Sequence, residues 1–135
     1  MKKIIFFIVI CSALITFAAP VFAGSERLKV PRVAYQAPDN QTVVDLTGKN
    51  SLAFQWKSTP IPGGGRHAYR FKVYKGFSYE TVTSQDLGQD VFSVEVPADK
   101  FDDGATYSWT VQQRDASNML WSLNDTWSFK VIKKK

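Results

Sequence analysis

Few residues in this chain have the types and spacing that catalysis requires. His67 is the only histidine of the 135 residues and follows a Gly-Gly-Gly-Arg segment (63–66), so we expect a solvated loop residue and not a general base. No Gly-x-Ser-x-Gly elbow is present for serine hydrolase chemistry. Asp102 and Asp103 are adjacent, so their side chains diverge and are not expected to flank a glycosidic bond. The sequence therefore predicts a protein that is not an enzyme.

Metal ligands are equally sparse. A zinc site needs three or four Cys, His or carboxylate ligands at tight spacing, and the chain has one cysteine and one histidine. Asp99, Asp102 and Asp103 could offer oxygens to calcium, but turn and capping roles account for them. We therefore predict no metal and no cofactor.

The first 23 residues have the order of a secretory signal peptide. Lys2 and Lys3 precede an apolar run, 4–17, and small residues follow up to Ala23. The run is about 14 residues long, whereas a bilayer span needs roughly 20. We predict cleavage after Ala23 and an extracytoplasmic product, periplasmic or secreted, with an uncleaved membrane anchor as the alternative.

The formal net charge of +5 is concentrated at the two ends of the chain. Removing the five lysines at positions 2, 3, 133, 134 and 135 from the 17 basic residues leaves 12, which equals the 12 acidic residues. A nucleic-acid-binding protein usually carries its positive excess on the fold itself. We therefore expect no nucleic-acid partner, and membrane contact only through an uncleaved signal segment or peripheral charge.

Residues 24–132 contain short runs in which apolar and polar residues alternate, which indicates half-buried strands. Turn-forming Pro, Gly, Asp and Asn clusters separate the runs, and the segment 24–37 is expected to be an extended lead-in or an edge strand. The pattern predicts one all-β domain, a two-sheet antiparallel sandwich of about seven strands without disulfides. We expect its core to contain Trp56, Tyr69, Phe71, Phe92, Phe101, Tyr107, Trp109 and Phe129.

The segment from Phe101 to Val111, FDDGATYSWTV, resembles the passage between strands E and F of fibronectin type III domains. This resemblance implies that Tyr107 forms a tyrosine corner, its hydroxyl bonding upstream backbone. The ending 121–131 is similar to the last strand of bacterial members, and Trp56 matches the core tryptophan of strand B. The likeness covers 38–132, between the lead-in and a basic tail, 133–135. It departs from the family in its long Pro- and Gly-rich loop between strands B and C and in having no neighbouring domain.

The sheet order that the resemblance implies makes strands C, F and G neighbours, so their outward side chains share one face. That face would carry four cations and one tyrosine, with no acid from those three strands: Arg70, Lys72, Arg114, Lys130 and Tyr74. Such a patch attracts anionic partners. Alternatively, these cations only keep the strands from pairing with other chains.

Several aromatic side chains are predicted to point outward or to lie in loops, namely Tyr35, Tyr74, Phe77, Tyr79 and Trp121. Tyr74, Tyr79 and Trp121 could offer flat apolar faces to sugar rings or to a protein. The alternative is that Phe77 and Trp121 cap the ends of the sandwich.

The sequence thus predicts an exported, non-catalytic recognition module that binds a polysaccharide, an anionic envelope polymer or a protein partner. A structural subunit of an envelope or extracellular assembly is the second reading. The candidate ligand-binding residues are Arg70, Lys72, Tyr74, Arg114, Lys130, Tyr79 and Trp121.

Overall fold

The computed structural model describes residues 30–77, 80–116 and 120–135, so the predicted signal peptide lies outside the described residues. The described residues form nine strands and one turn of 3-10 helix, η3 (Ala98–Lys100). The strands are β1 (Ala34–Ala37), β2 (Thr42–Asp45), β3 (Ser51–Lys57), β4 (His67–Lys75), β5 (Glu80–Leu87), β6 (Ser93–Pro97), β7 (Thr106–Asp115), β8 (Leu120–Trp121) and β9 (Trp127–Ile132).

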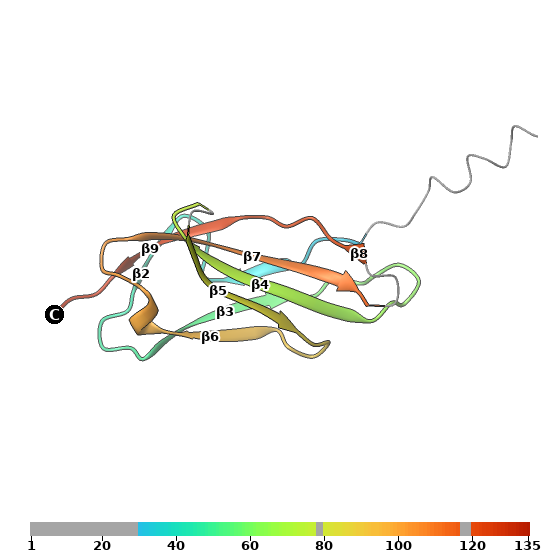
Figure 1. Cartoon of the computed structure of the whole chain (residues 1–135), viewed down its shortest axis with the longest axis horizontal. Coiled ribbons are helices and arrows are strands. Elements are labelled where there is room, and N and C mark those ends of the chain that lie inside the picture. The colour runs from blue at the N-terminus through green and yellow to red at the C-terminus, as the bar shows by residue number, and fades with distance from the viewer. Residues whose placement is uncertain (1–29, 78–79, 117–119) are drawn as a thin grey trace, which may run out of the picture.

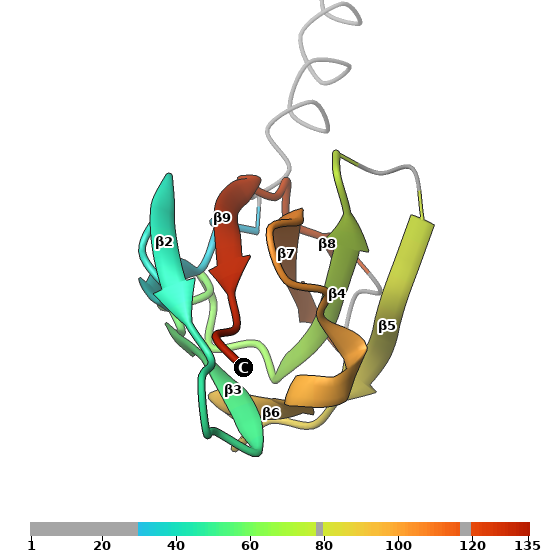
Figure 2. The same ribbon diagram turned by 90° about the vertical axis from the view of Figure 1, so that its left-hand side faces the viewer.

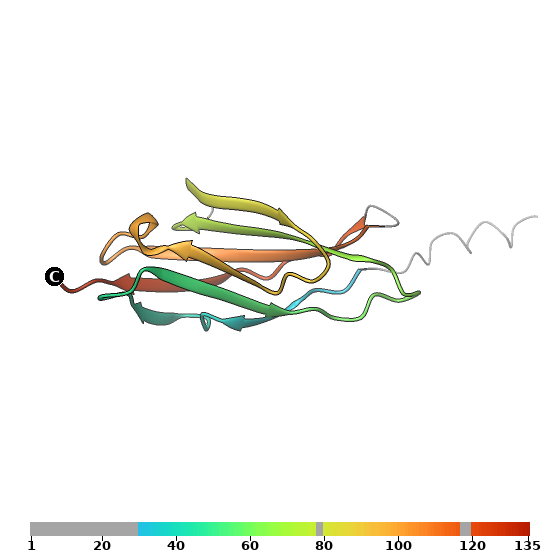
Figure 3. The same cartoon turned by 90° about the horizontal axis from the view of Figure 1, so that it is seen from below.

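Two sheets pack face to face, which confirms the predicted all-β sandwich (Figures 2 and 3). The smaller sheet has the order β1-β3-β6, and the larger one has the order β2-β9-β7-β4-β5, with β8 paired to β7. The larger sheet curves over the smaller one in the end view of Figure 2. Every pairing is antiparallel except that of β2 with β9, which is parallel.

Strict alternation of apolar residues gives each central strand one buried face. Leu52, Phe54 and Trp56 of β3 are buried and meet the buried face of β4 and β7 across the sandwich. The Phe54 ring lies at the centre, 5.0 Å from that of Phe71 and 5.3 Å from that of Trp109. Fully buried aromatic side chains dominate such a core, and removal of one costs about 3 to 5 kcal/mol.

The expectation that Phe92 belongs to this core was wrong. Its side chain is 42% exposed, because β6 begins at the next residue and Phe92 lies at the rim of the sandwich. There its ring meets the Tyr69 ring in a T-shaped arrangement with the centroids 5.9 Å apart, while its main-chain carbonyl accepts a hydrogen bond from the Trp56 main-chain N–H. The other seven predicted core aromatics are buried.

Two edge strands, β2 and β5, were not predicted. The β5 sequence ETVTSQDL has only two apolar residues, Val82 and Leu87, so it shows no alternation although both pack against the core. The β1 strand, in contrast, confirms the expected edge strand in the lead-in.

The β7 strand is ten residues long and lies between β9 and β4. The backbone N–H and C=O groups along both of its edges therefore need hydrogen-bond partners. One edge pairs with β4 from Tyr107 to Asp115, but the other pairs with β9 only from Thr106 to Trp109 and with β8 only at Arg114 and Asp115. In the gap, the Tyr35 hydroxyl accepts a hydrogen bond from the Val111 N–H at 2.7 Å.

Tyr35 is therefore a structural residue, not the outward aromatic that the sequence suggested. Its ring stacks on that of Trp109 at 4.5 Å, and its hydroxyl donates to the Asp125 carbonyl. Further along the same edge, Ser122 supplies hydrogen-bond partners to the main chain of Gln113. The Ser122 N–H donates to the Gln113 main-chain carbonyl, and the Ser122 Oγ accepts from the Gln113 main-chain N–H. Burial raises the pKa of Tyr35 well above its ordinary value.

The Gln113 side chain, which is fully buried, ties the start of the described chain to the loop after β3. Its Nε2 donates to the Pro31 carbonyl at 2.8 Å and to Thr59 Oγ1 at 2.9 Å. A buried amide without such partners would be costly, so these bonds hold residues 31 and 59 against β7.

The Tyr107 hydroxyl accepts a hydrogen bond from the Asp102 N–H at 2.6 Å, which is the upstream backbone contact expected of a tyrosine corner. The Tyr107 ring is fully buried and meets the Phe101 ring edge-on at 4.9 Å. The chain is thus fixed where it crosses from the smaller sheet to the larger one.

We predict that Tyr107→Phe retains the fold but lowers the free energy of unfolding by about 1 to 3 kcal/mol, because the Asp102 N–H loses its acceptor. Urea unfolding measures this loss. Tyr74→Phe is the matched control, since the hydroxyl of Tyr74 makes no hydrogen bond within the described part of the chain. Equal losses in the two variants would contradict a structural role specific to Tyr107.

Candidate binding face

The predicted cationic residues are positioned by three neighbouring strands of the larger sheet. Arg70 and Lys72 lie two residues apart on β4, opposite Gln112 and Thr110 of β7. Arg114 lies further along β7, and Lys130 lies on β9 opposite Thr106. Since the order β9-β7-β4 is the expected one, these side chains share the outer face of the sheet. We call this the basic sheet face and define it as Arg70, Lys72, Tyr74, Arg114 and Lys130.

The β5 strand adds an acid that the sequence analysis missed. Asp86 lies opposite Arg70, with Oδ1 2.8 Å from Arg70 Nε and Oδ2 3.3 Å from Nη2. The hydrogen bond from Arg70 lowers the pKa of Asp86, and the nearby charges of Arg114 and Lys72 lower it further. One of the four cations is therefore paired, and the face remains positive.

Trp121 lies on the same face because it pairs with Arg114 across β7 and β8. The Arg70 guanidinium carbon is 4.3 Å from the centre of the indole ring, and that of Arg114 is 5.2 Å away. These are cation–π distances. The half-buried Trp121 ring is thus in contact with both arginines of the basic sheet face and orients their guanidinium groups.

The remaining members of the face are open to solvent to different degrees. Lys130 is exposed between Thr106 and Val43, whereas Lys72 and Tyr74 are half-buried. Among the described residues, no carboxylate lies within ion-pair distance of the Lys72 or Lys130 ammonium group. Tyr79 lies outside the described residues, and Phe77, in the β4–β5 connection, is exposed.

The expectation that His67 is a solvated loop residue was wrong. His67 begins β4, is half-buried, and its Nε2 lies 3.0 Å from the Thr59 carbonyl oxygen. Asp102 pairs with Lys75 at 2.7 Å, and Asp103 accepts the Lys133 N–H. Over residues 30–77, 80–116 and 120–135, no three His, Cys, Asp or Glu side chains group as metal ligands would.

In the described part of the chain, no helix has both the length and the hydropathy of a membrane span. No protein-family model matches this chain, and no curated protein matches it significantly.

We predict that Arg70→Gln raises the pKa of Asp86 toward its ordinary value, because the largest cause of its depression is removed. A pH titration of the carboxyl ¹³C resonances measures this. A depressed folded-state pKa means that the pair stabilises the fold above the ordinary carboxyl pKa, and that this stabilisation is lost as the pH falls through the folded-state pKa.

Lys75→Gln is the control for this titration, since Lys75 pairs with Asp102 instead. It should raise the pKa of Asp102 and leave that of Asp86 unchanged. An Asp86 pKa that does not move in Arg70→Gln would contradict the pairing.

Proposed function

We propose that this chain is an exported, non-catalytic recognition module of the fibronectin type III kind, and that its basic sheet face binds an anionic polysaccharide or envelope polymer. The observation that supports the proposal is the charge on that face: four cations arrive from three adjacent strands, and Asp86 alone among the described residues forms an ion pair there. Charge of one sign on a single face steers an oppositely charged partner.

The arrangement favours recognition by charge over recognition by aromatic stacking. The Trp121 ring is already in contact with Arg70 and Arg114, so it is less available to a sugar ring. In return, the stacking restricts the two long side chains before a partner arrives, which reduces the entropy that binding must remove.

We predict that Lys72→Glu with Lys130→Glu weakens binding to an acidic polysaccharide by at least about tenfold at low salt, while leaving the melting temperature nearly unchanged. Exposed charges contribute little to stability, typically below about 1 kcal/mol each. Binding by the wild type should itself weaken as salt rises, because charges are screened over about 10 Å at 0.1 M. Isothermal titration calorimetry with polygalacturonate measures the affinity.

Lys57→Glu with Lys100→Glu is the matched control, since it makes the same change in net charge at two exposed positions on β3 and η3, outside the larger sheet. If the control weakens binding as much as the Lys72 and Lys130 reversal, the attraction depends on net charge alone and the basic sheet face has no recognition role.

One observation favours the second reading, a structural subunit. The β5 strand is an eight-residue edge strand with neither Lys nor Pro, the residues that commonly protect edges, although a bulge at Val82 interrupts its pairing with β4. Assembly through this edge should appear as a mass that rises with concentration in light scattering after gel filtration. Ser84→Pro should abolish the rise, and a constant monomer mass would exclude this route.

A further inference from the structure

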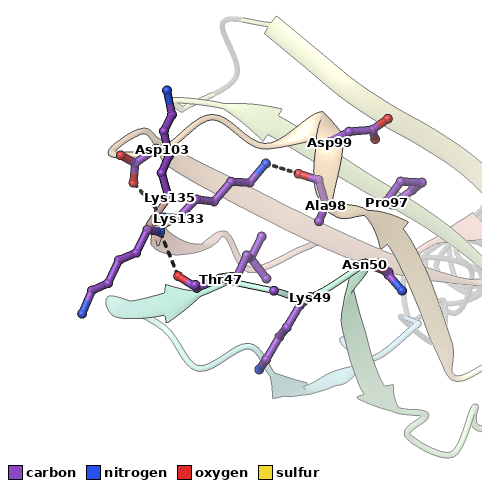
Figure 4. Close-up of a pocket in the computed structure, with 12 residues that line it drawn as sticks. Thr47, Lys49, Asn50, Pro97, Ala98, Asp99, Asp103, Lys133 and Lys135 are labelled. Atoms are coloured by element: carbon purple, nitrogen blue, oxygen red, sulfur yellow. Dashed lines mark hydrogen bonds between the residues drawn. The ribbon is translucent and has the colours of Figure 1, made fainter.

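A pocket of about 650 Å³ lies at the end of the sandwich where the chain reaches Lys135, opposite the end that carries β8 (Figures 1 and 4). It is lined by the turn after β2, by η3 with its flanks, and by the residues that follow β9. We call this the C-terminal pole. Its lining residues include four lysines and two aspartates, namely Lys49, Lys133, Lys134, Lys135, Asp99 and Asp103, so it is positive.

The basic residues 133–135 are docked at this pole. The Lys133 N–H donates to Asp103 Oδ1 at 2.7 Å, and its ammonium group donates to the Ala98 carbonyl across the pocket (Figure 4). The Lys134 N–H donates to Thr47 Oγ1 at 2.8 Å. The segment expected to be a basic tail is therefore held between the turn after β2 and η3, and it forms a wall of the pocket.

The lysines of the C-terminal pole contribute to the lowered pKa of a nearby carboxyl group, that of Asp45. Hydrogen bonds from Thr47 chiefly lower the pKa of Asp45, and the charges of Lys134 and Lys49 lower it further. Within the described residues, no carboxylate lies within ion-pair distance of the ammonium groups of Lys49, Lys134 or Lys135. Three lysines thus line the pocket without an ion-pair partner among the described residues.

The shape of the pole limits what these charges can bind. Figure 4 shows the Lys49 and Lys135 side chains pointing away from one another, so they do not converge on one small anion. None of the exposed large apolar side chains lines the pocket, which leaves no anchor for insertion into a bilayer. No aromatic residue lines it either, so it lacks the stacking platform of a single-stranded nucleic-acid site.

We propose that the C-terminal pole is a second binding site, which takes an extended polyanion whose negative charges are spaced along a polyol or sugar chain. Lys49, Lys134 and Lys135 contact successive charges of the chain, and Lys133 is a positioning residue that holds the wall. The ligand chemistry is that of a polyuronate or a polyphosphodiester. This site shares none of its residues with the basic sheet face and does not depend on it.

The test uses the purified protein, a short oligogalacturonate and a linear glycerol phosphate oligomer. Lys49→Gln with Lys134→Gln removes two rim charges and keeps the backbone bond of Lys134, and Lys57→Gln with Arg66→Gln is the control of equal charge. We expect binding at the pole, followed through the amide resonances of residues 47–50 and 133–135, to be about tenfold weaker in the pole variant than in the control for at least one oligomer. The same resonances should still respond to that oligomer in the Lys72 and Lys130 reversal. The oligomer with the larger loss identifies the anionic group.

Amide chemical shifts of the wild type give a test that needs no variant. Oligomer addition should move the resonances of residues 47–50 and 133–135. Shifts confined to the basic sheet face, or equal affinities of the pole variant and the control for both oligomers, would overturn the proposal. So would binding to vesicles containing anionic phospholipid that is lost in the pole variant when neither oligomer binds, because the ligand would then be a membrane surface.

Discussion

The constraint on which the rest of the structure depends is the complete hydrogen bonding of β7. The strand lies inside the larger sheet, so an unpaired group along either edge would be buried at a cost. Tyr35, Ser122 and Gln113 fill the gap between β9 and β8, and in doing so they fix the start of the described chain and the segment before β9. Because β4 and β9 both pair with β7, the register of this strand sets the relative positions of the cations on the basic sheet face.

The sequence predicted those elements whose apolar residues alternate, because alternation directly reports one buried face. It missed β5, whose polar side chains carry no such signal, and therefore missed Asp86 opposite Arg70. The contact of Trp121 with two arginines depends on the register of β8 on β7, which residue types alone do not determine. Phe92 was misplaced because alternation does not reveal where a strand begins. The predicted positions of four cations on one face, in contrast, needed only strand phase and sheet order.

The two charged regions differ in how they are built. On the basic sheet face, strand phase and cross-strand register set the positions of the cations, and Trp121 orients Arg70 and Arg114. At the C-terminal pole, main-chain hydrogen bonds to Asp103 and Thr47 hold residues 133–134 in place, and the Lys133 ammonium group donates to the Ala98 carbonyl. If both proposals hold, one small domain has two separate places for polyanions, and occupation of both by one polymer would add the benefit of a local effective concentration.

The parallel pairing of β2 with β9 has a consequence for the order in which the molecule is assembled. Thr42 meets Phe129 near the other end of the chain, and β2 has no other strand partner among the described residues. A chain that emerges vectorially, from a ribosome or through a translocation pore, presents β2 early but cannot pair it until residues 127–132 have followed. The β2 strand must wait unpaired, whereas β1 can pair with β3 as soon as residues 51–57 have emerged, and closing the long loop between β2 and β9 carries an entropic penalty and slows folding. The larger sheet can therefore be completed only after residues 127–132 have emerged.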